Sequence, residues 1–400
     1  MDGKTEQALT KGLGINIILL GIVSFINDTS SDMIWPILPM FIKSIGGTGV
    51  AVGLIGGLGE SVSSILKVFS GYWSDRFGRR KPLVASGYLL SSISKLIFPF
   101  INSWIHLLIL RPIERVGKGV RTAPRDAIIA GSVSEDVRGK GFGIHRALDT
   151  SGAILGSLLA FIFVWFFNLD LRAVLLIAAV LGFIALTPLI FVKDVTVVKR
   201  RKVSLKVSLG RLGGRFQMVI LVLTIFALGN FTYMFFILRA QEVFQGFLPG
   251  RMAEAIPILL YVLFNISYAL LSIPVGMLSD RVGRGRVLSV GYVLFGVMCL
   301  GFMISNSVYS FTLLFIMYGL FKASVDAVQR AYVSDLAPEG LRGTALGTFH
   351  ASIGLATLPA SAIAGILWDK VSPEATFLYG AALGLLASLS LIILVAKFRD

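Results

Sequence analysis

"GYWSDRFGRRK", residues 71–81, is the stretch that decides the fold, and the chain contains a second copy of it. The segment "GMLSDRVGRGR", residues 276–286, repeats its Gly, Ser, Asp, Arg, Gly and Arg positions at an offset of 205 residues. Lys118 matches Lys322, and "RGKGFG" (138–143) matches "RGTALG" (342–347), both at an offset of 204 residues. Three anchors at nearly one offset indicate an internal structural repeat.

The composition predicts that this repeat lies in a membrane. Of the 400 residues, 55% are hydrophobic and 15% are charged, whereas soluble domains carry about 25% charged residues. Apolar segments of about 20 residues recur along the chain, which is the length that spans a bilayer as a helix. We therefore predict an all-α integral membrane protein with twelve transmembrane helices in two six-helix repeats, at 14–43, 50–73, 82–102, 104–131, 141–166, 171–192, 216–242, 256–278, 287–306, 309–334, 344–367 and 374–396.

The basic residues predict the topology. The formal net charge is +15, and more than twenty Lys and Arg fall in the two tails and the even-numbered gaps between spans. The odd-numbered gaps hold four, which are Lys43, Arg172, Arg251 and Lys370. This asymmetry predicts a multi-pass protein of the cell membrane with both termini in the cytoplasm. We expect an N-terminal bundle (1–192), a basic cytoplasmic linker (193–215) and a C-terminal bundle (216–400).

The sequence argues against several kinds of chemistry. The single cysteine, Cys299, lies in an apolar run, and the three His show no metal-ligand spacing. Phosphate-binding loops and zinc-protease motifs are missing from the sequence, as is a basic, aromatic-interleaved tail for nucleic acid. We predict no enzyme activity, no cofactor, no metal and no nucleic-acid partner.

The repeated loop resembles the signature loop of the major facilitator superfamily. Its residues here are Gly71, Ser74, Asp75, Arg76, Gly78, Arg79 and Arg80, with a weaker copy from Gly276 to Arg284. The resemblance covers the whole chain and implies two bundles, one central substrate site and alternating access. It also implies that the charged loops form a cytoplasmic gate. The alternative is that these charges only determine the membrane topology. The implied gating residues are Gly71, Asp75, Arg76, Gly78, Arg79, Asp280, Arg281 and Arg284.

Two helices partly resemble the drug/proton antiporter branch of that superfamily. Arg115 takes the Arg position of the branch's Arg-x-x-Gln-Gly motif, and Lys118 stands where the motif has Gln. Gly152 and Gly156 match the antiporter helix, while Ser157 replaces its Pro. This partial resemblance implies proton-coupled export as the direction of transport.

The predicted span 104–131 carries seven charged side chains between Arg111 and Asp126. Each charge at the centre of a bilayer costs about 2.5–3.5 kcal/mol on insertion scales, so these side chains must avoid lipid. Their spacing of three and four residues places them on one broad helix face, which we expect to look into the bundle or a watery cavity. The resemblance implies a cavity lined by the first, fourth, seventh and tenth helices, on which the intramembrane charges concentrate.

These charges leave two interpretations open, namely structural ion pairs or a substrate site. The excess of basic over acidic residues favours a small anionic or zwitterionic substrate. We predict structural pairing for Arg125, Asp126, Arg146 and Asp149. The predicted cavity residues are Asn27, Arg111, Arg115, Lys118, Arg121, Asn230, Tyr233, Arg239, Lys322, Asp326, Gln329 and Arg330.

Asp28 and Asp32 are the candidates for proton coupling because both lie near mid-depth in the first span and burial favours a neutral carboxyl. The alternative is that each is permanently ionised against an Arg. The sequence as a whole predicts a monomeric secondary transporter in the lipid bilayer, moving a small solute with protons by alternating access and most simply as an exporter. Uptake of an organic anion is the alternative, ahead of a membrane-embedded enzyme or lipid-handling protein and of a channel.

Overall fold

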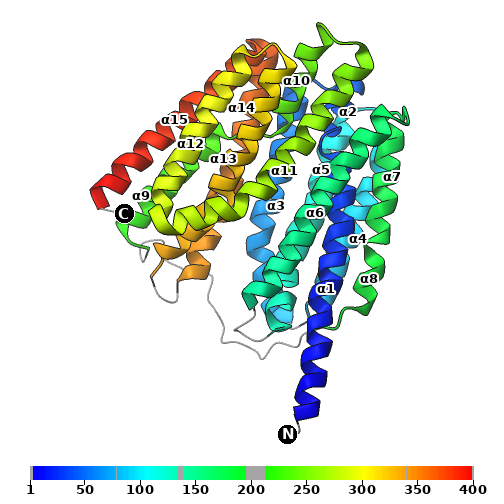
Figure 1. Ribbon diagram of the computed structural model, residues 1–400, viewed down its shortest axis with the longest axis vertical. Coiled ribbons are helices and arrows are strands. Elements are labelled where there is room, and N and C mark those ends of the chain that lie inside the picture. The colour runs from blue at the N-terminus through cyan, green and yellow to red at the C-terminus, as the bar shows by residue number, and fades with distance from the viewer. Residues whose placement is uncertain (1–2, 78, 134–137, 195–211, 339–340, 399–400) are drawn as a thin grey trace. The chain divides into compact units, whose positions relative to one another are not determined.

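The computed structural model describes residues 3–77, 79–133, 138–194, 212–338 and 341–398 (Figure 1). Every regular element in these ranges is a helix, as the prediction of an all-α protein requires. The elements are α1 (Gly3–Ile34), α2 (Leu38–Ser44), α3 (Gly49–Phe77), α4 (Lys81–Ile97), the short η1 (Phe98–Phe100), α5 (Trp104–Gly131), α6 (Arg138–Trp165), α7 (Leu171–Ile184), α8 (Leu186–Phe191), α9 (Gly214–Gly229), α10 (Met234–Gln245), α11 (Gly250–Val282), α12 (Arg284–Ile304), α13 (Val308–Asp335), α14 (Arg342–Lys370) and α15 (Pro373–Phe398).

Eleven stretches of helix in the described chain are long and apolar enough to cross a membrane. Four of them combine two consecutive elements, such as α1 with α2 and α9 with α10. The remaining long helix, α5, has 28 residues, which is long enough to cross a membrane. It is not among the eleven because it carries too many charged residues. With α5 included, the described residues contain the twelve predicted spans. The all-α membrane fold is therefore confirmed.

Two of these four divided spans have a break that the structure explains. In the first span α1 ends at Ile34 and α2 begins at Leu38, because Pro36 has no N–H to continue the helical hydrogen bonds. In the seventh span the backbone leaves the helix at Asn230, where ψ is 72°. The Thr232 N–H then donates to Ser361 Oγ (3.1 Å), and the Tyr379 hydroxyl donates to the Leu228 carbonyl. Side chains of α14 and α15 thus satisfy backbone groups that lipid could not.

The helix bounds follow the repeat seen in the sequence. The helix α5 runs from residue 104 to 131 and α13 from 308 to 335, which is an offset of 204 at both ends. Both helices begin after a serine, Ser103 or Ser307, whose side chain accepts a hydrogen bond from a backbone N–H of the first turn. The same capping chemistry therefore starts the same helix in each half.

The chain divides into two compact units, one of residues 1–37 with 62–202 and the other of residues 38–61 with 203–400. In the first unit α1 and α6 run side by side (Figure 1). Gly152 and Gly156 of α6 face the backbone of Phe25 and Thr29 in α1, where a Cβ on either glycine would overlap a carbonyl. Small residues four apart let two helix backbones approach closely, which drives packing in membranes.

The second unit has an aromatic core. Phe226 of α9 stacks on Tyr292 of α12 with ring centroids 3.8 Å apart, and Phe236 of α10 lies 4.9 Å from Phe302. The start of α3 is held in this unit by Asp369 at the end of α14, whose carboxylate accepts the N–H groups of Gly49 (2.7 Å) and Val50 (2.8 Å). A carboxylate in this position satisfies two otherwise unpaired helix N–H groups.

Gly283 joins α11 to α12 with a φ of +105°. Side chains other than glycine avoid this region of backbone space. The residue is the repeat mate of Gly78, which lies outside the described residues. Its conformation explains why the second copy of the signature loop keeps a glycine there.

We predict that Gly156→Ala destabilises the protein, because the added methyl group would force α6 away from α1. The matched control is Gly143→Ala on the same helix, since a Cβ at Gly143 meets nothing within 4 Å. Thermal unfolding of both purified variants in detergent would measure the effect. Equal unfolding temperatures for the two variants would show that the close contact between α1 and α6 contributes no stability.

Candidate functional site

Helix α5 carries the candidate site through the middle of the first unit. At 1.5 Å per residue its 28 residues extend about 42 Å, so its central charges lie far from both ends. Arg111, Glu114, Arg115 and Arg121 are each no more than 3% exposed. Charged groups buried this completely require partners, and the structure supplies them from four helices.

Glu114 is the acidic centre of the cluster. Its carboxylate accepts a hydrogen bond from Arg111 Nη1 at 2.9 Å and lies 3.8 Å from Arg115 Nε. The pair with Arg111 is formed one turn apart on the same helix. One carboxylate therefore compensates two guanidinium groups, and α5 keeps a net positive charge.

Trp35 lies against three of these cations. Arg115 stands 4.5 Å from the centre of the Trp35 ring, Lys118 5.4 Å and Arg111 5.6 Å. Attraction between a cation and an indole face strengthens when water is excluded. Our sequence analysis did not identify Trp35, although an aromatic residue beside the helix-breaking Pro36 is visible in the sequence. The ring holds Arg111, Arg115 and Lys118 together on one side of the cluster.

Lys95 is a second site residue that the sequence analysis missed. It lies in α4, is 1% exposed, and donates to Ser31 Oγ (2.8 Å) and Ser30 Oγ (3.0 Å) of α1. A solitary Lys in the apolar run 82–102 was the available signal, because a buried intramembrane charge marks a candidate functional site. Lys95 places a buried amine in the cluster around Glu114.

Arg121 lies toward the other side of α5. Its Nη1 donates to Ser91 Oγ of α4 at 2.8 Å, and its guanidinium lies 4.3 Å from the centre of the Tyr88 ring. Ser91 Oγ in turn donates to the Glu114 carbonyl at 3.0 Å. These contacts tie α4 to α5, so Arg121 has a packing role that the sequence did not distinguish from substrate binding.

The acidic partners come from α1 and α6. Asn27 Nδ2 donates to Asp28 Oδ1 at 3.0 Å, while Asn27 Oδ1 is buried without a hydrogen-bond partner among the described residues. The Asp28 carboxyl lies near the Asp149 carboxyl of α6. Two neighbouring carboxyls repel one another when both are ionised, so a proton on one of them relieves the repulsion. Lys118 is close enough to Asp28 and Asp32 to interact with both charges.

Ser24 of α1 joins four helices at the edge of the cluster. Its Oγ accepts from Arg125 Nη1 (3.2 Å) and hydrogen-bonds the Tyr88 hydroxyl (3.2 Å) and His145 Nε2 (2.9 Å). Arg125 also pairs with Asp126, with Nη2 and Oδ1 3.0 Å apart. Arg146 pairs with Asp149 at 2.9 Å, so Asp149 contacts both Arg146 and Asp28.

The predicted cavity residues of the second unit form separate local contacts. Lys322 pairs with Asp326 one turn away on α13 at 3.1 Å. Gln329 donates to the buried Tyr292 hydroxyl at 2.7 Å, and Arg330 Nε donates to the Asp326 carbonyl. The Tyr233 ring, beside the break at Asn230, lies 5.8 Å from the Tyr261 ring. Most of the charge on α13 is therefore satisfied within that helix.

Arg239 has the contacts of a structural residue. Its Nη2 lies 2.7 Å from Glu374 of α15, and its guanidinium donates to the carbonyls of Phe302 and Met303 at the end of α12. It thus holds the end of α12 and the start of α15 against the middle of α10, and none of these contacts connects it to Lys322. The sequence grouped the two only because both are intramembrane cations.

The loop residues assigned to gating are only partly described. Arg284 pairs with Asp335 (2.5 Å) and Asp280 (3.3 Å), which links α12 to α13 and α11. Arg79 and Arg281 are exposed. The backbone of Gly71, Asp75 and Arg76 belongs to α3, but their side chains, like the whole of Gly78, lie outside the described residues.

Comparison with known proteins identifies the chain. The family model of the Major Facilitator Superfamily matches residues 20–247 and 252–400. This chain belongs to the Major Facilitator Superfamily. It is a membrane transporter and not an enzyme.

Relatives of this superfamily member give more detail. It is 50% identical over 391 residues to an uncharacterized MFS-type transporter of Methanocaldococcus jannaschii, covering 98% of this chain and 96% of that protein. It is 27% identical over 151 residues to the quinolone resistance protein NorA of Staphylococcus aureus, or 38% of this chain and 36% of that protein. The solved structure of the nucleoside transporter NupG matches with a TM-score of 0.73 at 14% identity, covering 96% of this chain and 98% of that one. The last similarity shows a shared fold.

We predict that Glu114→Gln destabilises the transporter by about 3–5 kcal/mol, because removing one partner leaves buried cations uncompensated. Asp126→Asn is the matched control, since the Asp126 side chain is 43% exposed and water can replace its contact with Arg125. Thermal or denaturant unfolding in detergent would compare the two. A Glu114→Gln variant as stable as the control would mean that Arg111 and Arg115 do not depend on this carboxylate.

Proposed function

We propose that this superfamily member is a proton-coupled secondary transporter that exports a small anionic or zwitterionic solute by alternating access. The observation that carries the proposal is the buried charge cluster of the first unit, where the neighbouring carboxyls of Asp28 and Asp149 lie close to an excess of positive charge. Proton release and anion binding there would affect one another electrostatically. The partial similarity to NorA, a quinolone resistance protein, supports export as the direction.

Asp28 is the proposed proton carrier. Arg146 at 2.9 Å neutralises the Asp149 carboxylate. Asp28 is proposed to hold the proton, because burial and a neighbouring carboxylate both favour a neutral carboxyl. When Asp28 loses that proton, its carboxylate becomes negatively charged beside Lys118. The carboxylate then competes with an anionic substrate for interaction with Lys118. Asp32, close to Lys118 as well, is proposed as the second group in this exchange.

The proposed substrate contacts are Arg115, Lys118 and Asn27. The cluster around α5 contains four cations, Arg111, Arg115, Lys118 and Arg121, against three carboxyls, Asp28, Asp32 and Glu114. Arg and Lys bind carboxylate or phosphate groups strongly in a dry site. Asn27 Oδ1, which lacks a hydrogen-bond partner among the described residues, would accept from an N–H or O–H of the same solute. Arg121 is proposed to position α5 on α4.

The superfamily membership supports a proposal for the gate and for the topology. We propose that the pairs of Arg284 with Asp280 and Asp335 hold the ends of α11, α12 and α13 together in one state and separate in another. The loop around Asp75, Arg76 and Arg79 is proposed to do the same in the first half. The distribution of Lys and Arg supports cytoplasmic termini in the cell membrane, with 193–215 as the linker of a monomer.

We predict that Asp28→Asn abolishes proton-driven accumulation but preserves solute exchange. Asparagine can donate an N–H to Asp149, so the packing survives, but it has no proton to release. Proteoliposomes containing a pH-sensitive dye would report proton movement when small carboxylic acids, amino acids or sugar phosphates are added in turn. Asp126→Asn serves as the control and should retain coupling. Full coupling in Asp28→Asn would assign the proton to another group.

We predict that Lys118→Gln weakens binding of an anionic solute about 10-fold to 100-fold, the equivalent of losing one hydrogen bond to a charged group. Lys370→Gln, an exposed residue in the last turn of α14, is the control and should bind normally. Thermal-shift titration with the solutes that move in the liposome assay would give both affinities. Equal affinities for an anion in both variants would exclude Lys118 as a substrate contact.

A further inference from the structure

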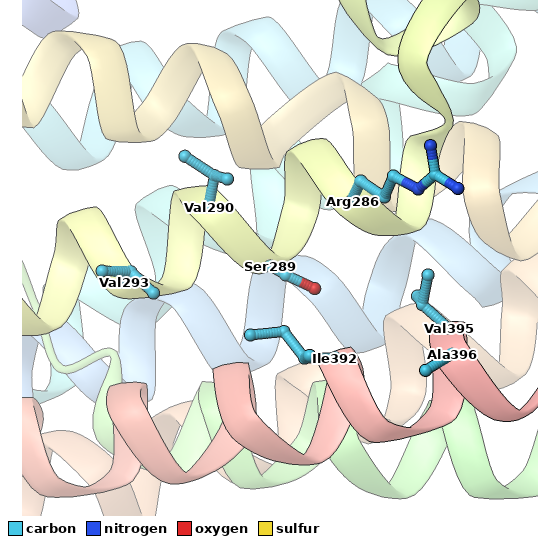
Figure 2. Close-up of a pocket in the computed structure, with 7 residues that line it drawn as sticks. All are labelled: Arg286, Ser289, Val290, Val293, Ile392, Val395 and Ala396. Carbon is cyan, nitrogen blue, oxygen red and sulfur yellow. The ribbon is translucent and has the colours of Figure 1, made fainter.

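A groove lies between α12 and α15 on the surface of the second unit. These two helices run side by side (Figure 1), and the space between them measures about 560 Å³. Figure 2 shows Arg286 at one end, near Val395 and Ala396, with Val293 at the other end. The lining residues are Arg286, Ser289, Val290, Val293, Ile392, Val395 and Ala396.

The walls of the groove are suited to hydrocarbon. Val290 is 57% exposed and Ile392 48% exposed, and Leu389 farther along α15 is 58% exposed. The only hydroxyl in the lining, that of Ser289, donates to the Gly285 carbonyl at 2.9 Å and is therefore already used. In a membrane transporter such an apolar surface faces lipid chains.

Arg286 gives the groove a charged end. Its neighbour Arg284 is neutralised by Asp280 and Asp335. Arg286 has only a hydrogen bond at 3.4 Å to the Val282 carbonyl of the preceding helix, and it forms no salt bridge with any described residue. It lies in the first turn of α12, at a helix end, where a long basic side chain reaches the lipid headgroups. The guanidinium therefore needs an anion at the mouth of an apolar groove.

We propose that this groove binds one phospholipid with a net negative headgroup. The phosphate would accept hydrogen bonds from Arg286, and an acyl chain would lie along Val290, Val293 and Ile392. Guanidinium groups bind phosphate through two parallel N–H donors, and basic pockets between membrane helices bind anionic lipid headgroups. Exposed Arg281 and Lys397 at the same helix ends add to the positive potential. The site is separate from the charge cluster of the first unit.

Native mass spectrometry of the full-length protein in mild detergent would test this proposal. Phosphatidylglycerol and phosphatidylcholine are added separately, and the bound fraction is measured for each. The wild-type protein should retain phosphatidylglycerol in preference to phosphatidylcholine, and Arg286→Ala should lower phosphatidylglycerol retention about 10-fold. Lys370→Ala, which removes an exposed cation from the other end of the second unit, is the matched control and should retain the lipid.

A second variant and a second ligand distinguish the contribution of the apolar groove to lipid binding from the contribution of the Arg286 charge. Ala396→Phe fills the groove without removing Arg286, and it should lower retention of phosphatidylglycerol as well. Phosphatidylglycerol should raise the unfolding temperature of the protein, and inorganic phosphate alone should leave it unchanged. Stabilisation by phosphate equal to that by the lipid, or undiminished lipid retention in Arg286→Ala, would overturn the proposal. Unfolding temperatures without added lipid would show that each variant is folded.

Discussion

The burial of the α5 charges is the constraint on which the first unit depends. Lipid cannot solvate a guanidinium or a carboxylate, so every charge on this helix must be compensated by protein. Glu114 compensates Arg111 and Arg115 on α5 itself. The remaining positive charge is met by hydroxyls and carboxyls of α1, α4 and α6. The same buried side chains therefore pack the four helices together and set the electrostatics of the proposed transport cycle.

The fold could be predicted closely because membrane spanning imposes a strong sequence pattern. The predicted span 104–131 coincides with α5 at both ends, since Ser103 supplies a cap and the apolar run begins directly after it. The break in the seventh span was hidden from the sequence. The backbone groups at this break form hydrogen bonds with Ser361 and Tyr379, which lie more than a hundred residues away in the sequence. No neighbouring residue therefore indicates the break.

The site was predicted less completely than the fold, and the reason is physical. Sequence spacing shows which charges share a helix face, but it does not show which neighbour each charge contacts. Arg121 and Arg115 look equivalent on α5, yet one packs on Tyr88 and the other on Trp35. Trp35 was missed because its importance comes from the cations of α5 that meet it in space. Asp149, predicted only as a member of a structural ion pair, lies against Asp28 as well as Arg146.

The two repeats differ in where their charges are neutralised, and this difference bears on how the chain enters the membrane. Lys322 pairs with the Asp326 carboxylate one turn away on α13. This charge of α13 is therefore neutralised within the same helix. Lys118 and Arg121 of α5 rely on α1 and α4, which are synthesised earlier. A nascent α5 leaving the ribosome therefore lacks the hydrophobicity to partition into lipid alone. Its insertion should wait for the earlier helices to assemble beside the translocation channel, which makes the order of synthesis part of how this fold is reached.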